Sequence, residues 1–138
     1  MTDLTLHLRL VGATMLVLAA SHRYYRKRFA WAEETARLSL INREIFYVHA
    51  LFIVLVLVLN GSLCLFAPEA LLEPTRLGRL VAGGLTFFWG TRLAVQLFVY
   101  DRNLWRGRRF ETAVHVLFTV VWTYFTVVFA WVLAWQVG

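Results

Sequence analysis

The chain has 138 residues, of which 60% are hydrophobic, and it carries a formal net charge of +6. A soluble domain of this length cannot bury so much apolar surface, so the composition excludes an ordinary soluble protein and predicts a single membrane domain. The basic residues lie beside aromatic residues and apolar runs. This pattern indicates the surface of a lipid bilayer, and not nucleic acid, as their partner.

The first apolar run, residues 4–21, is long enough to span a bilayer if the Arg9 side chain reaches outward to the headgroups. A signal peptide is not expected, because the positive charges follow the run and no small-residue cleavage pattern comes after it. The connection at residues 22–44 is basic and aromatic, and it contains no Gly or Pro between Ala30 and Ile41. It predicts a short helix lying along the membrane interface.

Three further apolar runs follow, at residues 45–66, 77–100 and 112–137. Barrel strands would alternate in polarity over about ten residues, and these runs do not, so helices are the expected structure. The sequence therefore predicts an all-α integral membrane protein, a bundle of four transmembrane helices with a lipid bilayer as its environment.

The loop charges predict the orientation of this bundle. Six Lys and Arg lie in residues 22–44 and four in residues 101–111, whereas the second connection has only Arg76, with Arg79 just beyond it. The positive-inside rule then places both basic connections in the cytoplasm and both termini outside it. The expected location is a bacterial inner membrane.

One cluster of polar residues predicts a site. Arg92 and Gln96 stand one helical turn apart within the third run, where a charge costs at least ~2.5 kcal/mol and no acidic residue lies in any span. His49 and His115 each lie one turn into their runs, at the same predicted depth. A polar stripe on the fourth run also predicts an inward face: Thr112, His115, Thr119, Trp122 and Thr126. The expected cofactor-binding set, near the cytoplasmic face, is His49, Arg92, Gln96, Tyr100 and His115.

Three functions are compatible with that set. Two histidines on separate helices can ligate haem b, or donate to the carbonyl of a quinone, and with His22 they can also bind a metal ion. The first alternative is a ligand-free subunit of a larger membrane complex, or a homo-oligomer, in which the histidines only bond helices together. The second is a proton or ion pathway. No catalytic motif is present, so no enzyme activity is predicted.

Small residues recur every four positions along the third run, and this spacing lets helix backbones approach closely. Because Arg92 lies about 200° around the helix from Gly90, the two features are expected on opposite faces. Arginine has the stronger claim on the interior, so the small residues are expected to face outward, toward a second copy or another protein. The predicted helix–helix interface consists of Gly78, Ala82, Thr86, Gly90 and Ala94.

Overall fold

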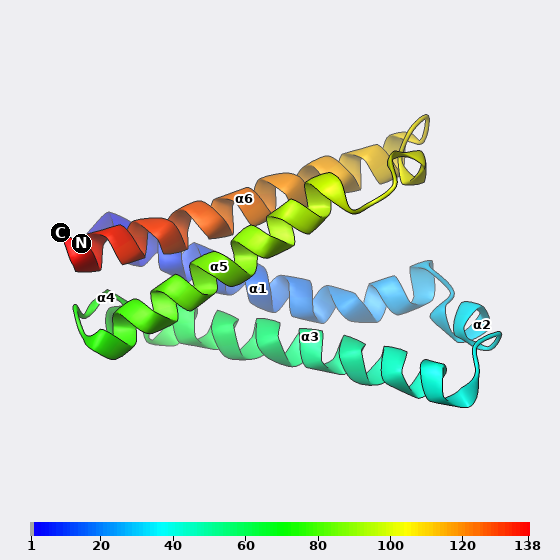
Figure 1. The fold of residues 1–138 in the computed structure, drawn as a ribbon, viewed down its shortest axis with the longest axis horizontal. Helices are drawn as coiled ribbons and strands as arrows, with labels where there is room; N and C mark the ends of the chain where they lie inside the picture. The colour runs from blue at the N-terminus through cyan, green and yellow to red at the C-terminus, as the bar shows by residue number, and fades with distance from the viewer. Residues whose placement is uncertain (1) are drawn as a thin grey trace. The chain divides into compact units, whose positions relative to one another are not determined.

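The structure is a computed structural model, and it describes residues 2–138 (Figure 1). Within these residues the chain is helical throughout, without a strand, which confirms the predicted all-α class. The elements are α1 (Thr2–Arg28), α2 (Trp31–Thr35), α3 (Leu40–Phe66), α4 (Pro68–Leu72), α5 (Arg76–Phe98), the 3-10 helix η1 (Arg102–Leu104) and α6 (Arg109–Val137).

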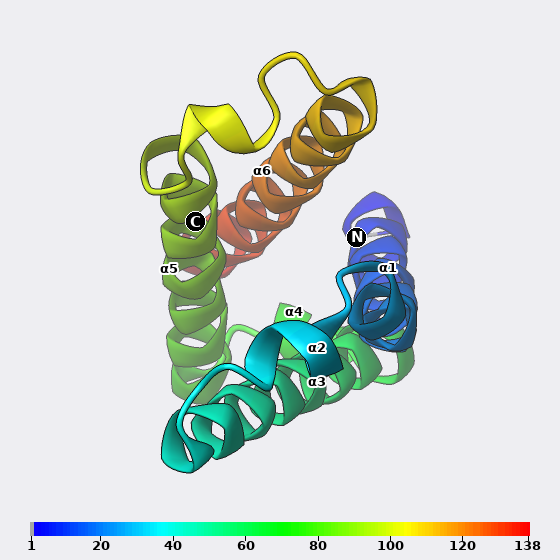
Figure 2. The same ribbon diagram turned by 90° about the vertical axis from the view of Figure 1, so that its right-hand side faces the viewer.

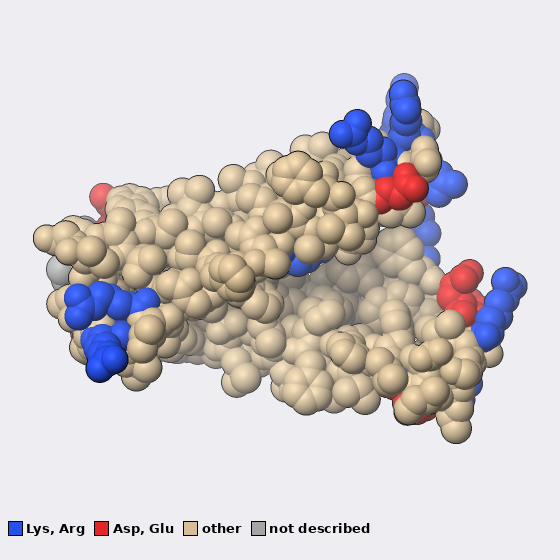
Figure 3. Space-filling model, in the orientation of Figure 1, with Lys and Arg blue, Asp and Glu red and all other residues tan. Residues whose placement is uncertain are grey.

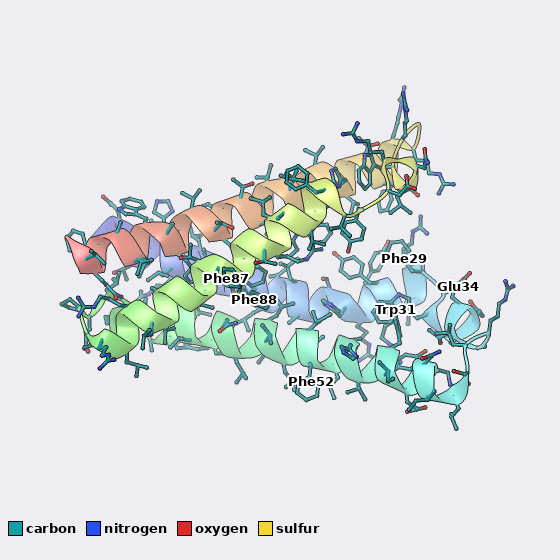
Figure 4. All side chains as sticks on the ribbon, in the orientation of Figure 1. Phe29, Trp31, Glu34, Phe52, Phe87 and Phe88 are labelled. Carbon is teal, nitrogen blue, oxygen red and sulfur yellow. The ribbon has the colours of Figure 1, made fainter. Side chains whose placement is uncertain are left out.

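Three of these helices, α1, α3 and α6, are long and apolar enough to cross a membrane. Large apolar side chains such as Phe52 of α3 and Phe87 of α5 point outward, with 60% and 78% of their surface exposed (Figure 4). Figure 3 shows that most Lys and Arg gather at the helix ends. The fourth expected span, α5, is not among the three, since Arg92 and Gln96 lower its hydropathy.

The long helices α1 and α3 extend beyond the predicted spans. α1 continues to Arg28, and the basic residues of its last turn suit the negative end of the helix dipole. The left-handed conformation of Ala30 (φ 46°) then separates α1 from α2, and α3 begins after the extended Ser39. The short helix expected in the first connection is present as α2, although it has only five residues.

The chain forms two compact units, residues 6–68 and residues 69–138, the latter together with the first residues of α1. In the first unit, α1 and α3 touch backbone to backbone at Gly12 and Gly61. A Cβ atom on Gly12 would lie 2.6 Å from the Gly61 carbonyl oxygen and 2.7 Å from the Leu65 nitrogen. Only glycine permits this approach, so the two glycines set how closely the helices pack.

The short helix α2 is attached to α3 at the end of this first unit (Figure 2). The Trp31 ring meets the Phe46 ring edge-on at 4.9 Å, and the Thr35 hydroxyl lies 3.2 Å from the Tyr47 hydroxyl. Thr35 is buried, and its hydroxyl also donates to the Trp31 carbonyl. These contacts hold α2 in one position, despite its short length.

The second unit is built on the antiparallel pair α5 and α6. Buried residues on both helices recur in steps of three and four, the spacing of helices that pack like a coiled coil. On α5 they are Gly78, Ala82, Leu85, Trp89 and Gln96, and on α6 they include Trp122, Phe125, Phe129, Val132 and Gln136. Figure 1 shows the two helices running side by side and crossing.

The small-residue stripe of α5 is used within the chain. A Cβ atom on Gly78 would lie 3.2 Å from the Gln136 amide nitrogen of α6, and one on Gly90 would lie 3.6 Å from the Thr126 methyl group. Ala82 is fully buried, Thr86 is half-buried and Ala94 is exposed.

The prediction that this whole stripe lies opposite Arg92 is wrong, because it fails for Gly78. Residues four apart are rotated by about 400°, so each step drifts by about 40° and the five positions do not share one face. Gly78 lies about 40° from Arg92, and both are on the side of α5 that faces α6. Gly78 and Gly90 therefore do not face outward as expected. The prediction of an oligomer, which was based on that outward orientation, no longer has this support.

Candidate functional site

A hydrogen-bond chain of three side chains connects α5 to α6. The Arg92 guanidinium nitrogen Nη1 donates to the Gln96 amide oxygen at 3.2 Å, within α5. The Gln96 amide nitrogen lies 2.7 Å from Nδ1 of His115 on α6. Gln96 is buried, and Arg92 and His115 are half-buried. These hydrogen bonds join three of the five residues that the sequence proposed for a cofactor site, and a fourth, Tyr100, places its ring against Arg92.

The direction of donation along this chain determines the form of His115. Arginine can only donate, so Gln96 turns its oxygen toward Arg92 and its NH₂ group toward His115. Nδ1 of His115 must then accept a hydrogen bond, and in the neutral imidazole the proton lies on Nε2. His115 consequently presents an N–H donor, and no free nitrogen lone pair, on the side away from Gln96.

Aromatic rings surround the Arg92 side chain. Its guanidinium carbon lies 5.0 Å from the centre of the Trp122 ring and 5.6 Å from that of Tyr100. In the described part of the chain its partners are thus an amide and two rings, with no carboxylate among them. A desolvated cation–π contact contributes about 2 kcal/mol. The combined stabilisation from the two contacts is comparable with the ~2.5–3.5 kcal/mol that inserting an arginine into a membrane costs.

Trp105 covers one face of His115. The two rings are stacked, with centres 3.8 Å apart and planes inclined by 13°. Trp105 follows η1 in the loop between α5 and α6, and the Thr112 hydroxyl at the start of α6 lies 2.7 Å from its carbonyl oxygen. The Asp101 carboxylate caps η1 by accepting a hydrogen bond from the backbone N–H of Asn103. The loop is therefore fixed at both ends, and it holds the indole against the imidazole.

Two indole N–H groups next to this network have no acceptor. Trp89 and Trp122 stack on one another at 5.2 Å with an angle of 15°, and 3% and 6% of their surface is exposed. Neither Nε1 atom has a hydrogen-bond partner within residues 2–138. A buried donor without a partner costs about 1–3 kcal/mol, so a group that accepted from either N–H would recover that free energy.

His49 and His22 differ from His115 in both place and form. Both belong to the first unit, on α3 and α1, whereas His115 belongs to the second. Nδ1 of His49 donates to the Ile45 carbonyl at 2.7 Å, and Nδ1 of His22 donates to the Leu18 carbonyl at 2.9 Å. The neutral form of each ring therefore carries a lone pair on Nε2, the opposite of His115.

These hydrogen bonds bear on the metal and haem hypotheses. A histidine that ligates haem or a metal through Nε2 offers the lone pair of that nitrogen while its Nδ1–H donates elsewhere. His49 and His22 have this form, whereas His115 has the reverse. No three His, Cys, Asp or Glu residues gather into a metal site among residues 2–138.

The threonine hydroxyls of the predicted polar stripe on α6 donate hydrogen bonds to nearby backbone carbonyls. The hydroxyls of Thr112, Thr119 and Thr126 each donate to the carbonyl one turn earlier in the chain, at 2.7–2.8 Å. A hydroxyl bonded in this way needs no partner in the bundle, so threonine spacing alone does not identify an inward face. Only His115 and Trp122 of that stripe contribute to the network.

The sequence reasoning missed Trp105 and Trp89. Trp105 reaches His115 only because of the loop conformation, and a helical wheel carries no information about it. Trp89 lies seven residues before Gln96, two turns along the same face, and this spacing was a signal that could have placed it beside the network.

Comparisons with known proteins leave the site to be interpreted on its chemistry. No protein-family model matches the chain, and no curated protein or solved structure matches it.

Proposed function

We propose that the chain is an integral membrane protein in which α5 forms a fourth span, and that the α5–α6 pair binds a lipophilic carbonyl ligand of the quinone class. The observation that carries the proposal is the donor chain from Arg92 through Gln96 to His115, which makes the other ring nitrogen of His115, Nε2, an N–H donor. The basic connections face the cytoplasm in this proposal, and both termini lie outside it.

The length and partners of α5 support its place as a span. Its 23 residues extend for about 34 Å, slightly more than the ~30 Å hydrocarbon core of a bilayer. Its packing against α6 shields Gln96 and Trp89, and the rings around Arg92 offset much of the cost of that charge. Once it is packed, α5 therefore exposes mainly apolar side chains such as Phe87.

A quinone fits the donor chemistry better than haem does. A quinone carbonyl oxygen accepts hydrogen bonds, and Nε2–H of His115 donates one. Haem iron needs a nitrogen lone pair, which His115 supplies only if the Gln96 amide turns over and gives up its bond with Arg92. The flat rings of Tyr100 and Trp105 beside the two ends of the chain suit a planar ligand, because offset aromatic stacking adds about 0.5–1.5 kcal/mol per pair.

A second function has its own supporting observation. Arg92 and Gln96 already have partners inside the pair of helices, so the network also suits a ligand-free subunit in which these side chains only fasten α5 to α6. The two functions differ in their response to a ligand. A binding site gains stability when quinone is added, and a fastening network does not.

The test is a titration of the purified protein with a short-chain ubiquinone analogue in mild detergent, followed by tryptophan fluorescence and thermal unfolding. We expect saturable quenching and a rise in unfolding temperature for the wild type. His115→Phe keeps a ring stacked on Trp105 but removes the donor. The loss of one hydrogen bond costs about 1–1.5 kcal/mol, so its Kd should rise about fivefold to tenfold.

His49→Phe is the matched control, since it removes a histidine from the other unit. It should leave quinone affinity unchanged, and an equal loss in both variants would favour the shared site first expected from the sequence. An absorption spectrum of the same sample gives a further check. A Soret band from bound haem would contradict the quinone assignment, and a wild type that neither quenches nor gains stability would favour the ligand-free subunit.

A further inference from the structure

The first unit contains a cavity of about 1140 Å³ at the end that carries α2. Its walls come from the last turns of α1, from the start of α2 and from the second to fourth turns of α3, all within residues 19–54. Ligand pockets commonly enclose about 300–1,000 Å³, so this space accommodates a group larger than a single ion. None of its lining residues belongs to the network on α5 and α6.

The charge on the lining is strongly one-sided. Arg23, Arg26 and Lys27 line the cavity from the last two turns of α1, beside His22, and Glu33 is the one acidic residue of the lining. The guanidinium of Arg26 lies 5.7 Å from the centre of the Tyr47 ring on α3, so this cation is held at the α1–α3 side of the space. Such a lining favours an anion, and it suits phosphate, which arginine binds through paired N–H donors.

The opposite part of the lining is apolar. Ala19 on α1 and Ala50, Leu51 and Val54 on α3 continue the cavity away from the basic residues, toward the middle of two helices that are apolar enough to cross a membrane. The lining is thus cationic at one end and hydrocarbon at the other. A free phosphate ion would use only the first end, whereas a phospholipid would use both.

The geometry of α2 keeps this space open. Trp31 lines the cavity, and its edge-on contact with Phe46 fixes it to α3. The left-handed conformation of Ala30 ends α1 and turns the chain back. This turn places α2 beside the two long helices. The wall is therefore part of the fold, in contrast with a flexible basic tail that meets lipid headgroups only by long-range attraction.

We propose that this cavity binds one anionic phospholipid, with its phosphate between Arg23, Arg26 and Lys27 and the upper part of an acyl chain along Ala50 and Val54. The site places a specific lipid at the α1–α2–α3 junction. Its occupation would stabilise the first unit, because a ligand that binds only the folded state shifts the unfolding equilibrium.

The experiment measures lipid retention by the delipidated full-length protein in detergent, using native mass spectrometry with dioleoyl-phosphatidylglycerol and dioleoyl-phosphatidylcholine. We expect one phosphatidylglycerol per chain at saturation and much weaker binding of phosphatidylcholine. Each basic residue near an anionic lipid contributes about a fivefold factor in affinity, so the double variant Arg23→Gln/Arg26→Gln should lose about 30-fold.

The matched control is Arg106→Gln/Arg108→Gln, which removes the same charge from the other basic loop and should leave binding unchanged. Ala50→Leu fills the apolar end of the cavity and leaves its charges in place. It should lower the affinity for the lipid, and it should leave competition by inorganic phosphate unchanged. Helical circular dichroism of each variant checks that it is folded.

Two outcomes would overturn the proposal. Equal losses in the two double variants would show attraction to the whole basic surface and no particular site. Binding that Ala50→Leu does not change, and that inorganic phosphate displaces completely at equal concentration, would identify a site for free phosphate and not for a lipid.

Discussion

The close crossing of α1 and α3 gives the sharpest prediction about stability, and Gly12→Ala tests it. The added Cβ would stand 2.6 Å from one backbone atom of α3 and 2.7 Å from another, where contacts under 3.0 Å force something to move. Neither atom belongs to a flexible side chain, so the two helices must separate by several tenths of an ångström. Separation weakens the packing of the buried side chains on both sides of the crossing, such as Met15 and Cys64.

The size of the effect follows from two opposing contributions. Overpacking a well-packed contact costs about 1–3 kcal/mol, and replacing glycine by alanine within a helix returns about 0.5–1 kcal/mol. The net loss for Gly12→Ala is therefore about 1–2 kcal/mol. Gly84→Ala is the control, since no atom lies within 4 Å of its added Cβ, and it should stabilise the protein by about 0.5–1 kcal/mol.

The assay is reversible unfolding in mixed micelles with increasing dodecyl sulfate, followed by circular dichroism. The two alanine variants should move the midpoint in opposite directions, with a difference of about 1–3 kcal/mol between them, because the helix gain is common to both. If Gly12→Ala unfolds at the same point as Gly84→Ala, the backbone contact between α1 and α3 does not exist in the membrane protein.

Two further predictions concern orientation and the loop. Cysteine placed at Arg26 or Arg106 should resist an impermeant maleimide in intact cells and react after lysis, because both basic connections face the cytoplasm in the proposed topology; labelling in intact cells would reverse that topology. Thr112→Val should release the carbonyl of Trp105 and loosen the stacking of its ring on His115, at a cost of about 1 kcal/mol. The measurement is the quenching of tryptophan fluorescence by iodide, which should increase. Unchanged quenching by iodide would show that the hydroxyl does not hold the loop.

Much of the helical architecture could be predicted from the sequence, because apolar length alone determines where a helix can cross a membrane. The four apolar runs became the four long helices, although α1 and α3 extend into the flanking basic segments. Helix ends depend on local features such as the left-handed Ala30, which no composition rule anticipates. The membrane placement of α5 stays a proposal, since Arg92 and Gln96 lie within its apolar stretch and it is not among the helices that are apolar enough to cross a membrane.

The candidate site was predictable only in part. Arg92 and Gln96 are one turn apart on one helix, and the cost of a buried charge indicated that they would turn toward a neighbouring helix, as they do. The partner His115 lay at a matching depth on α6. The stack of Trp105 depends on the path of a loop, and the misplaced small-residue stripe came from treating a spacing of four residues as if it followed one face of the helix.

The central claim is that His115 presents an N–H donor to a ligand, and nitrogen-15 NMR of histidine-labelled protein tests it most directly. His115→Phe assigns the His115 signals by their loss. Neutral His115 should carry its proton on Nε2, and neutral His22 and His49 should carry theirs on Nδ1. A quinone analogue should shift the Nε2 resonance of His115 alone. A His115 ring protonated on Nδ1, like the other two, would contradict the donor chain and the function built on it.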